Sequence, residues 1–103
     1  MHVIIFITAK DKAEAQKIST HLVEKRLIAC ANVIAGIQSL FWWEGKVDRA
    51  KEVLLVLKTK RTKFKAIVAA VKKLHSYSVP EVIAFPIVEG NKDYLKWIDE
   101  SVK

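Results

Sequence analysis

The chain has 103 residues, of which 51% are hydrophobic, and its 18 Lys and Arg residues against 11 Asp and Glu residues give a formal charge of +7. This length predicts one domain, residues 1–103, with a real but small core. No apolar stretch reaches the length of a membrane span, and no signal peptide or membrane partner is expected. A lone cysteine, Cys30, excludes an internal disulfide and favours a cytoplasmic location.

The N-terminal region predicts a strand followed by a helix. Residues 2–8 are rich in β-branched and aromatic side chains, which is typical of a strand with neighbours on both sides. From Asp11 to about Arg26, apolar residues recur at three and four positions, as on one face of a helix. Asp11 and Glu14 have the spacing of a capping box at its start.

A long hairpin is expected next. Residues 27–34 and 37–43 have strand composition, and residues 35–36 predict a bulge or bend between them. The pair Glu44–Gly45 predicts a turn, and residues 46–59 form the return strand, whose first half is polar and whose second half is apolar.

The C-terminal part predicts a helix, a strand and a last helix. The first of these helices is expected to begin at a cap formed by Thr59 or Thr62. Its apolar stripe has the spacing of one helix face and consists of Phe64, Ile67, Val68, Val71 and Leu74. Residues 81–88 predict a strand, which Pro86 places at a sheet edge because proline has no N–H to donate. Asn91 is expected to cap the last helix.

This order of elements predicts an α+β fold: a ferredoxin-like βαββαβ sandwich with a long protruding β-hairpin and a C-terminal helix. Two helices then cover one face of a four-stranded antiparallel sheet. At about 3.3 Å per residue, each hairpin arm spans about 45 Å or more, whereas a domain of this size has a radius of gyration of about 13 Å. The hairpin must therefore bend sharply or project beyond the sandwich.

Three aromatic residues, Phe41, Trp42 and Trp43, lie beside the hairpin turn, where solvent exposure is expected. A two-stranded ribbon is marginally stable alone, and exposed apolar patches favour association. We predict that these residues form an oligomer interface. The alternative is that a bend at Gly36 folds them back onto their own domain.

A basic block lies between Glu52 and Glu81, where no acidic residue occurs. It consists of Lys58, Lys60, Arg61, Lys63, Lys65, Lys72 and Lys73. These residues alternate with apolar ones at helical spacing, which is typical of a solvated helix face. No aromatic residues alternate with them as a stacking platform, so nucleic acid is not an expected partner.

Five segments, in order along nearly the whole chain, resemble the CutA family of divalent-cation-tolerance proteins: 26-RLIACANV-33, 42-WWEGKV-47, 52-EVLLVLKT-59, 75-HSYSVPEV-82 and 94-YLKWI-98. The resemblance implies a ferredoxin-like homotrimer whose hairpins extend onto neighbours. It also implies a link to copper and other divalent metal ions, no required cofactor and no established turnover. The trimeric plan resembles that of the PII signalling proteins. The alternative function is therefore a sensor of small anions or nucleotides that uses Lys58, Lys60 and Arg61 beside intersubunit clefts.

The resemblance directs attention to the loop after residue 74. His75 is the first candidate for a copper or zinc ligand, because a neutral imidazole suits these ions, and Glu81 is a second metal candidate. Tyr77 and Lys58 are expected to line a ligand cleft. A structural role for His75, at the C-terminal end of a helix, is the competing hypothesis.

The chain departs from the family pattern at three positions. Some members carry a Cys where this chain has Ile7 and a His where it has Leu74, and the usual proline of the loop is replaced by Ser76. These departures weaken the expectation of a soft-metal site. Cys30 is expected to pack as a small apolar residue, with a soft-metal thiolate or a nucleophile paired with His75 as alternatives.

Overall fold

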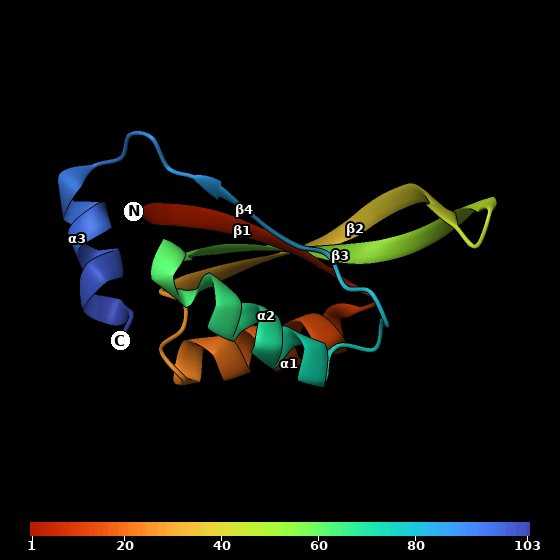
Figure 1. Cartoon of the computed structure of the whole chain (residues 1–103), viewed down its shortest axis with the longest axis horizontal. Coiled ribbons are helices and arrows are strands. Elements are labelled where there is room, and N and C mark those ends of the chain that lie inside the picture. The colour runs from red at the N-terminus through yellow and green to blue at the C-terminus, as the bar shows by residue number, and fades with distance from the viewer.

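The computed structural model describes all 103 residues and contains the predicted order of elements. In sequence these are β1 (His2–Ala9), α1 (Lys12–Glu24), β2 (Cys30–Trp43), β3 (Lys46–Lys60), a 3-10 turn (Arg61–Lys63), α2 (Phe64–Leu74), β4 (Val82–Pro86) and α3 (Lys92–Ser101). The strands form one antiparallel sheet in the order β2-β3-β1-β4. Figure 1 shows α1 and α2 together beneath one face of this sheet, and α3 beyond its end. The predicted ferredoxin-like α+β fold is confirmed. No helix combines the length and the apolar composition needed to cross a membrane.

The core lies between the sheet and the two helices. Along β1, buried and partly exposed residues alternate, so that Val3, Ile5 and Ile7 face the helices. The predicted stripe of α1 is fully buried against them, and Ile67 and Val71 form the centre of the α2 stripe. Burial of such apolar surface is the main stabilising contribution of a small domain. The opposite face of the sheet carries no helix (Figure 1).

Several predicted boundaries hold and others shift. Asn91 caps α3 by accepting a hydrogen bond from the backbone N–H of Asp93 at 2.9 Å, and β4 lies at the sheet edge as Pro86 required. The predicted Thr59 cap is wrong. Thr59 is fully buried within β3, and its hydroxyl donates to the carbonyl oxygen of Leu27 at 2.6 Å.

Thr62 does not cap a helix either, because it lies inside the 3-10 turn that leads into α2, and no side chain caps that turn or α2. The strand predicted for residues 81–88 is shorter, Val82–Pro86, since the chain leaves the sheet after proline. Residues 27–29 likewise lie outside β2, although the Ala29 N–H still donates to the Lys58 carbonyl oxygen at 2.8 Å.

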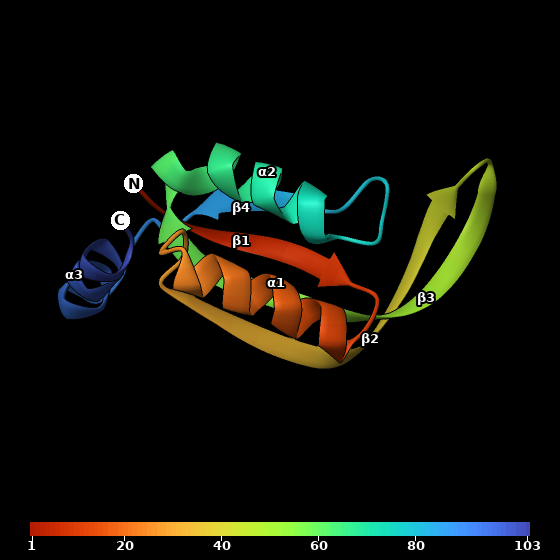
Figure 2. The ribbon, with the colours of Figure 1, turned by 90° about the horizontal axis from the view of Figure 1, so that it is seen from below.

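The hairpin of β2 and β3 projects from the sandwich and curves beyond it (Figures 1 and 2). The molecule measures 44 Å along its longest axis against 25 and 23 Å along the others. A register shift between Ile34 and Ile37 confirms the predicted bulge, where Gly36 has φ +81°. At the tip, Glu44 and Gly45 both have positive φ, as a type I′ turn requires. The aromatic residues are not folded back into the core: Trp42 is 75% exposed.

Gly36 offers a test of the bulge. No atom would lie within 4 Å of an added Cβ, but φ +81° is strained for any residue with a side chain. We expect Gly36→Ala to lower the free energy of unfolding by about 1–2 kcal/mol in urea denaturation. Lys51→Ala, an exposed change on the paired strand, is the control and should have little effect. Equal stability of the Gly36→Ala variant and the wild type would contradict the strained backbone.

Candidate functional site

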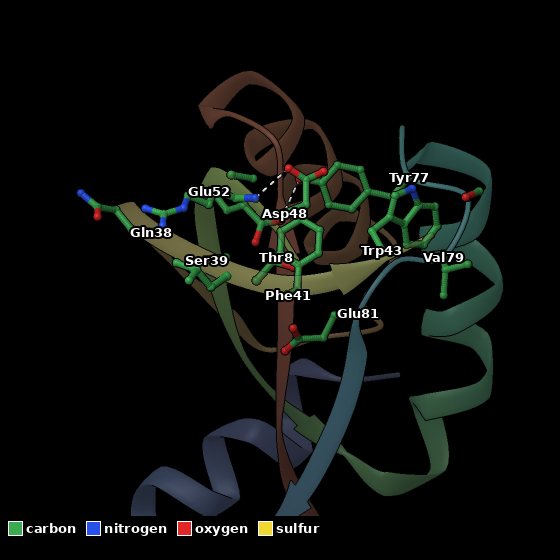
Figure 3. Close-up of a pocket in the computed structure, with 14 residues that line it drawn as sticks. Thr8, Gln38, Ser39, Phe41, Trp43, Asp48, Glu52, Tyr77, Val79 and Glu81 are labelled. Atoms are coloured by element: carbon green, nitrogen blue, oxygen red, sulfur yellow. Dashed lines mark hydrogen bonds between the residues drawn. The ribbon is translucent and has the colours of Figure 1, made fainter. Parts of the chain in front are cut away.

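A cavity of about 740 Å³ lies where the inner face of the hairpin meets the loop between α2 and β4 (Figure 3). Its notable side chains are three aromatic rings and three carboxylates. These are Phe41, Trp43, Tyr77, Asp48, Glu52 and Glu81. The strand register explains part of this set, because Phe41 lies directly opposite Asp48 across the hairpin and Trp43 lies two residues further along the same face. The predicted cleft residue Tyr77 and the predicted metal ligand Glu81 therefore lie at one cavity.

Glu52 is the most deeply buried acid of the cavity, with 8% of its surface exposed. Its Oε2 accepts a hydrogen bond from the Tyr77 hydroxyl at 2.7 Å. Within 4 Å, the acidic side chains that lie near a basic one are Asp99, beside His2, and Glu14, beside His75, so no cationic side chain lies within 4 Å of the Glu52 carboxylate. A buried charge without a counter-charge is costly, and it favours a cation in the cavity.

The pKa shifts of the neighbouring groups reflect this charge. Burial, the hydrogen bond to Glu52 and the charge of Glu52 raise the pKa of Tyr77 above its ordinary value, so the phenol remains a hydrogen-bond donor. Burial and the charge of Glu52 also raise the pKa of Glu81, which immediately precedes β4 and points into the cavity (Figure 3). The two carboxylates repel each other, and a bound cation would relieve that repulsion.

The side chain of His75 is fully buried, and both of its ring nitrogens have partners within the chain. Nε2 lies 2.7 Å from the carbonyl oxygen of Thr8, and Nδ1 lies 3.0 Å from the backbone nitrogen of Tyr77. Since Nδ1 accepts the Tyr77 N–H, the proton lies on Nε2, which donates to Thr8. This geometry supports the structural hypothesis: the imidazole holds the loop against β1, and neither nitrogen has a lone pair free for a metal.

Glu14 holds the same loop from α1. Its Oε1 accepts from the Lys10 N–H at 3.1 Å and its Oε2 accepts from the Ser76 N–H at 2.9 Å, while the Asp11 side chain caps the helix through the Glu14 N–H. Burial by itself raises the pKa of Glu14, but the hydrogen bonds from Ser76 and Lys10 and the nearby His75 together lower it. The carboxylate thus joins α1 to the loop instead of closing the predicted capping box.

Lys58 lies apart from this cavity within the single chain. It is six residues from Glu52 along β3, about 20 Å at the spacing of a strand. Its ammonium group donates to the Asn32 side-chain oxygen and lies 3.8 Å from the Cys30 sulfur. Tyr77 and Lys58, predicted to share a cleft, are separate in one protomer. Cys30 and His75 likewise have different partners, so the chain does not bring that nucleophile and base together.

The donor atoms of the chain do not form a closed soft-metal site. No group of three or more His, Cys, Asp and Glu side chains is placed to hold a metal ion. His75 has no free nitrogen, and the Cys30 sulfur lies beside a cationic ammonium group. The donors that remain are the carboxylate oxygens of Glu52 and Glu81, a set that suits an open, partly hydrated divalent ion.

Sequence reasoning missed Glu52 and Asp48 as cavity residues. Both belong to the first half of the return strand, which the sequence identified only as polar. A usable signal was the acid at Glu52, immediately before the apolar run that begins at Val53. A charged residue at the boundary of a buried strand is a candidate for a buried polar contact.

Comparisons with known proteins agree with this fold. Residues 3–101 match the family described as CutA1 divalent ion tolerance protein. The divalent-cation tolerance protein CutA of Archaeoglobus fulgidus is 46% identical over 103 residues, which is all of both chains. Its solved structure, described as a periplasmic divalent cation tolerance protein, has a TM-score of 0.97. The Cut A1 structure from Thermus thermophilus has a TM-score of 0.98 at 41% identity and covers all of both chains.

The Glu14 contacts predict a pH-dependent stability. Because the pKa of Glu14 is lowered from 4.5 by folding, its charged form stabilises the protein above that value, and the contribution disappears as the pH falls through the lowered pKa. We expect Glu14→Gln to lower the free energy of unfolding at pH 7 by about 1–3 kcal/mol, since an amide cannot accept both N–H groups as well.

Urea denaturation at a series of pH values measures this difference, which should shrink on acidification. Glu24→Gln, an exposed change at the end of α1, is the control. A Glu14→Gln effect of the same size at all pH values would contradict the proposed role of the carboxylate charge.

Proposed function

Because the chain belongs to the CutA1 divalent ion tolerance family, we propose that it is a homotrimeric protein of divalent-cation tolerance that binds divalent ions without turnover. The observation that carries the cation-binding part is the Glu52 carboxylate, which is only 8% exposed, has no cationic partner and lines the same cavity as Glu81. Glu52 and Glu81 are the proposed ligands. Copper remains the first ion to test, since it binds oxygen and nitrogen sites more strongly than other first-row divalent ions.

The uncovered face of the sheet supports assembly. Phe6 of β1 lies opposite Val56 of β3 and Ile83 of β4, and the Phe6 and Phe85 rings meet edge to face at 4.8 Å. Ile83 is 51% exposed and Phe85 is 38% exposed. Apolar side chains on an open sheet face favour burial against another surface. Because the resemblance to the CutA family implies a homotrimer, sister chains are the proposed cover.

The hairpin supports assembly in a second way. Trp42, at 75% exposure, and Val47, at 55%, are register partners on the ribbon face opposite the cavity. Phe41 and Trp43 point into the cavity, as Figure 3 shows. We therefore propose Trp42 as the principal intersubunit contact among the three hairpin aromatics, with Phe41 and Trp43 at the border of the interface.

Two further features concern turnover and compartment. The thiol of Cys30 and the imidazole of His75 have separate partners, which supports binding without catalysis. The single unpaired cysteine supports a cytoplasmic location as the proposed compartment, although the Archaeoglobus relative is described as periplasmic.

A PII-like nucleotide sensor is less well supported by the cavity. Three carboxylates and one guanidinium, that of Arg49, line it, and this charge disfavours phosphate. Lys58 makes its contacts with Asn32 and Cys30, away from that cavity.

Replacement of the tryptophan side chains of the hairpin by alanine tests the assembly. Burial of a large aromatic side chain contributes about 1.5–3 kcal/mol. Loss of Trp42 from each of the three subunits should therefore destabilise the proposed trimer. We expect a trimer mass for the wild type in light scattering, and dissociation or insolubility for Trp42→Ala and for the Trp42→Ala/Trp43→Ala pair. Val23→Ala, an exposed apolar truncation on α1, should remain trimeric. A monodisperse wild-type monomer would contradict the assembly.

Calorimetry tests the cation site. Metal-free protein titrated with Cu²⁺ and Zn²⁺ should bind, and Glu81→Gln should weaken binding about tenfold or more, the loss of one charged ligand. Glu89→Gln is the exposed control. Loss of binding in His75→Ala with unchanged binding in Glu81→Gln would place the metal on His75 instead. Binding of ATP with steep salt dependence, and none of metal, would favour the nucleotide sensor.

A further inference from the structure

The cavity between the hairpin and the loop has an aromatic wall that a metal ion would not use. Phe41 and Trp43 come from β2, and Tyr77 comes from the loop after α2, so the rings approach from two sides (Figure 3). Phe41 is 37% exposed and Trp43 is 44% exposed, so neither ring is fully packed in this chain. The face of an aromatic ring attracts organic cations through its quadrupole and contributes no donor atom to a metal.

The aromatic wall stands beside an uncompensated negative charge. Glu52 is nine-tenths buried, one of its oxygens accepts from Tyr77, and no Lys, Arg or His pairs with it. Three carboxylates line the cavity against one guanidinium, although the whole chain carries a charge of +7. The cavity is thus a local region of negative charge on a basic protein, which selects for cations over anions.

The size of the cavity exceeds what a bare ion needs. Its volume of about 740 Å³ falls within the range of sites for small organic molecules, about 300–1,000 Å³. A hydrated metal ion held by two carboxylates would leave the aromatic side of the cavity empty. An organic cation of several carbon atoms would contact both sides at once.

One wall of the site is pre-organised. The Tyr77 backbone N–H donates to His75 Nδ1, its hydroxyl donates to Glu52, and the two rings of His75 and Tyr77 lie 4.6 Å apart between centroids. The phenol is therefore held in place before any ligand arrives. Such pre-organisation lowers the entropy lost when a ligand binds.

From these observations we propose that the cavity binds an organic ammonium ion, with the cationic nitrogen near Glu52 and Glu81 and its alkyl groups against Trp43 and Phe41. This inference goes beyond the proposed function, because it assigns a second class of cation to the cavity. It shares the two carboxylates with the proposed divalent-ion site and adds the aromatic residues. Divalent ions and organic ammonium ions should consequently compete.

The test uses the full chain in metal-free buffer, with choline as the probe and 3,3-dimethyl-1-butanol as its uncharged isostere. Isothermal titration calorimetry and ligand-observed NMR measure binding. We expect choline to bind at least tenfold more tightly than the isostere, and Cu²⁺ to displace it. Equal binding of the two compounds would show an apolar cavity without charge selection and would overturn the proposal.

Variants separate this inference from the divalent-ion site. Trp43→Leu should weaken choline binding about tenfold and leave Cu²⁺ binding unchanged. Glu52→Gln should weaken the binding of both ligands. The glutamine oxygen of that variant can still accept the hydrogen bond from the Tyr77 hydroxyl, so the loop should keep its position. Trp43→Phe should bind choline more tightly than Trp43→Leu, because it keeps an aromatic ring. Trp97→Leu, on α3 away from the cavity, is the control and should change neither choline binding nor Cu²⁺ binding. Light scattering and thermal unfolding confirm that each variant remains assembled and folded; Phe41→Leu replaces Trp43→Leu if the latter dissociates.

Two results would decide against the inference. Choline binding that survives in both Trp43→Leu and Phe41→Leu would place the ligand outside the aromatic wall. No choline binding, with Cu²⁺ binding that Glu81→Gln weakens, would overturn the inference and leave the proposed function intact. Choline binding without Cu²⁺ binding would support the inference and contradict the divalent-ion site.

Discussion

The loop between α2 and β4 is positioned by a small buried network, and the cavity depends on it. His75 connects the loop to β1 through Thr8, and Glu14 connects it to α1 through the Ser76 N–H. With the loop held at both points, Tyr77 reaches across to Glu52 on the hairpin. A residue that the metal-tolerance resemblance marked as a ligand therefore acts in this chain as a support for the cavity wall. Buried polar networks of this kind specify a single arrangement when each member is satisfied.

The same architecture leaves apolar surface open where a single chain cannot cover it. Two helices cover one face of the sheet, while the other face and the outer side of the hairpin carry exposed aromatic and aliphatic side chains. The hairpin also curves away from the sandwich (Figure 2), and residues of its inner side line the cavity together with residues of the loop (Figure 3). The proposed assembly and the proposed ligand binding would thus involve opposite faces of the same hairpin. A change at the Gly36 bulge should affect both, because the bulge sets the direction of the arm.

The charge distribution gives the cavity its chemical character. The basic residues of the 3-10 turn and α2 lie on solvent-exposed surfaces, whereas the acids of the return strand gather with the aromatic rings of β2. A net positive chain therefore contains one concave region that favours cations. Family membership alone indicates divalent-ion tolerance; the proposal that the cavity also takes organic cations rests on the aromatic wall and the buried Glu52 carboxylate.

The sequence alone determined the order of elements, the bulge at Gly36, the turn at Glu44–Gly45 and the edge position of β4, because local periodicity and backbone restrictions dictate these features. It also indicated the protruding arm, because each residue of a strand adds about 3.3 Å to its length and the two arms are too long for a compact domain. It could not place Glu52 with Tyr77, which are 25 residues apart. Nor could it show that both nitrogens of His75 are occupied by groups from β1 and the loop. Those contacts arise between distant segments, so only the tertiary structure decided that His75 supports the site and that carboxylates and aromatic rings line it.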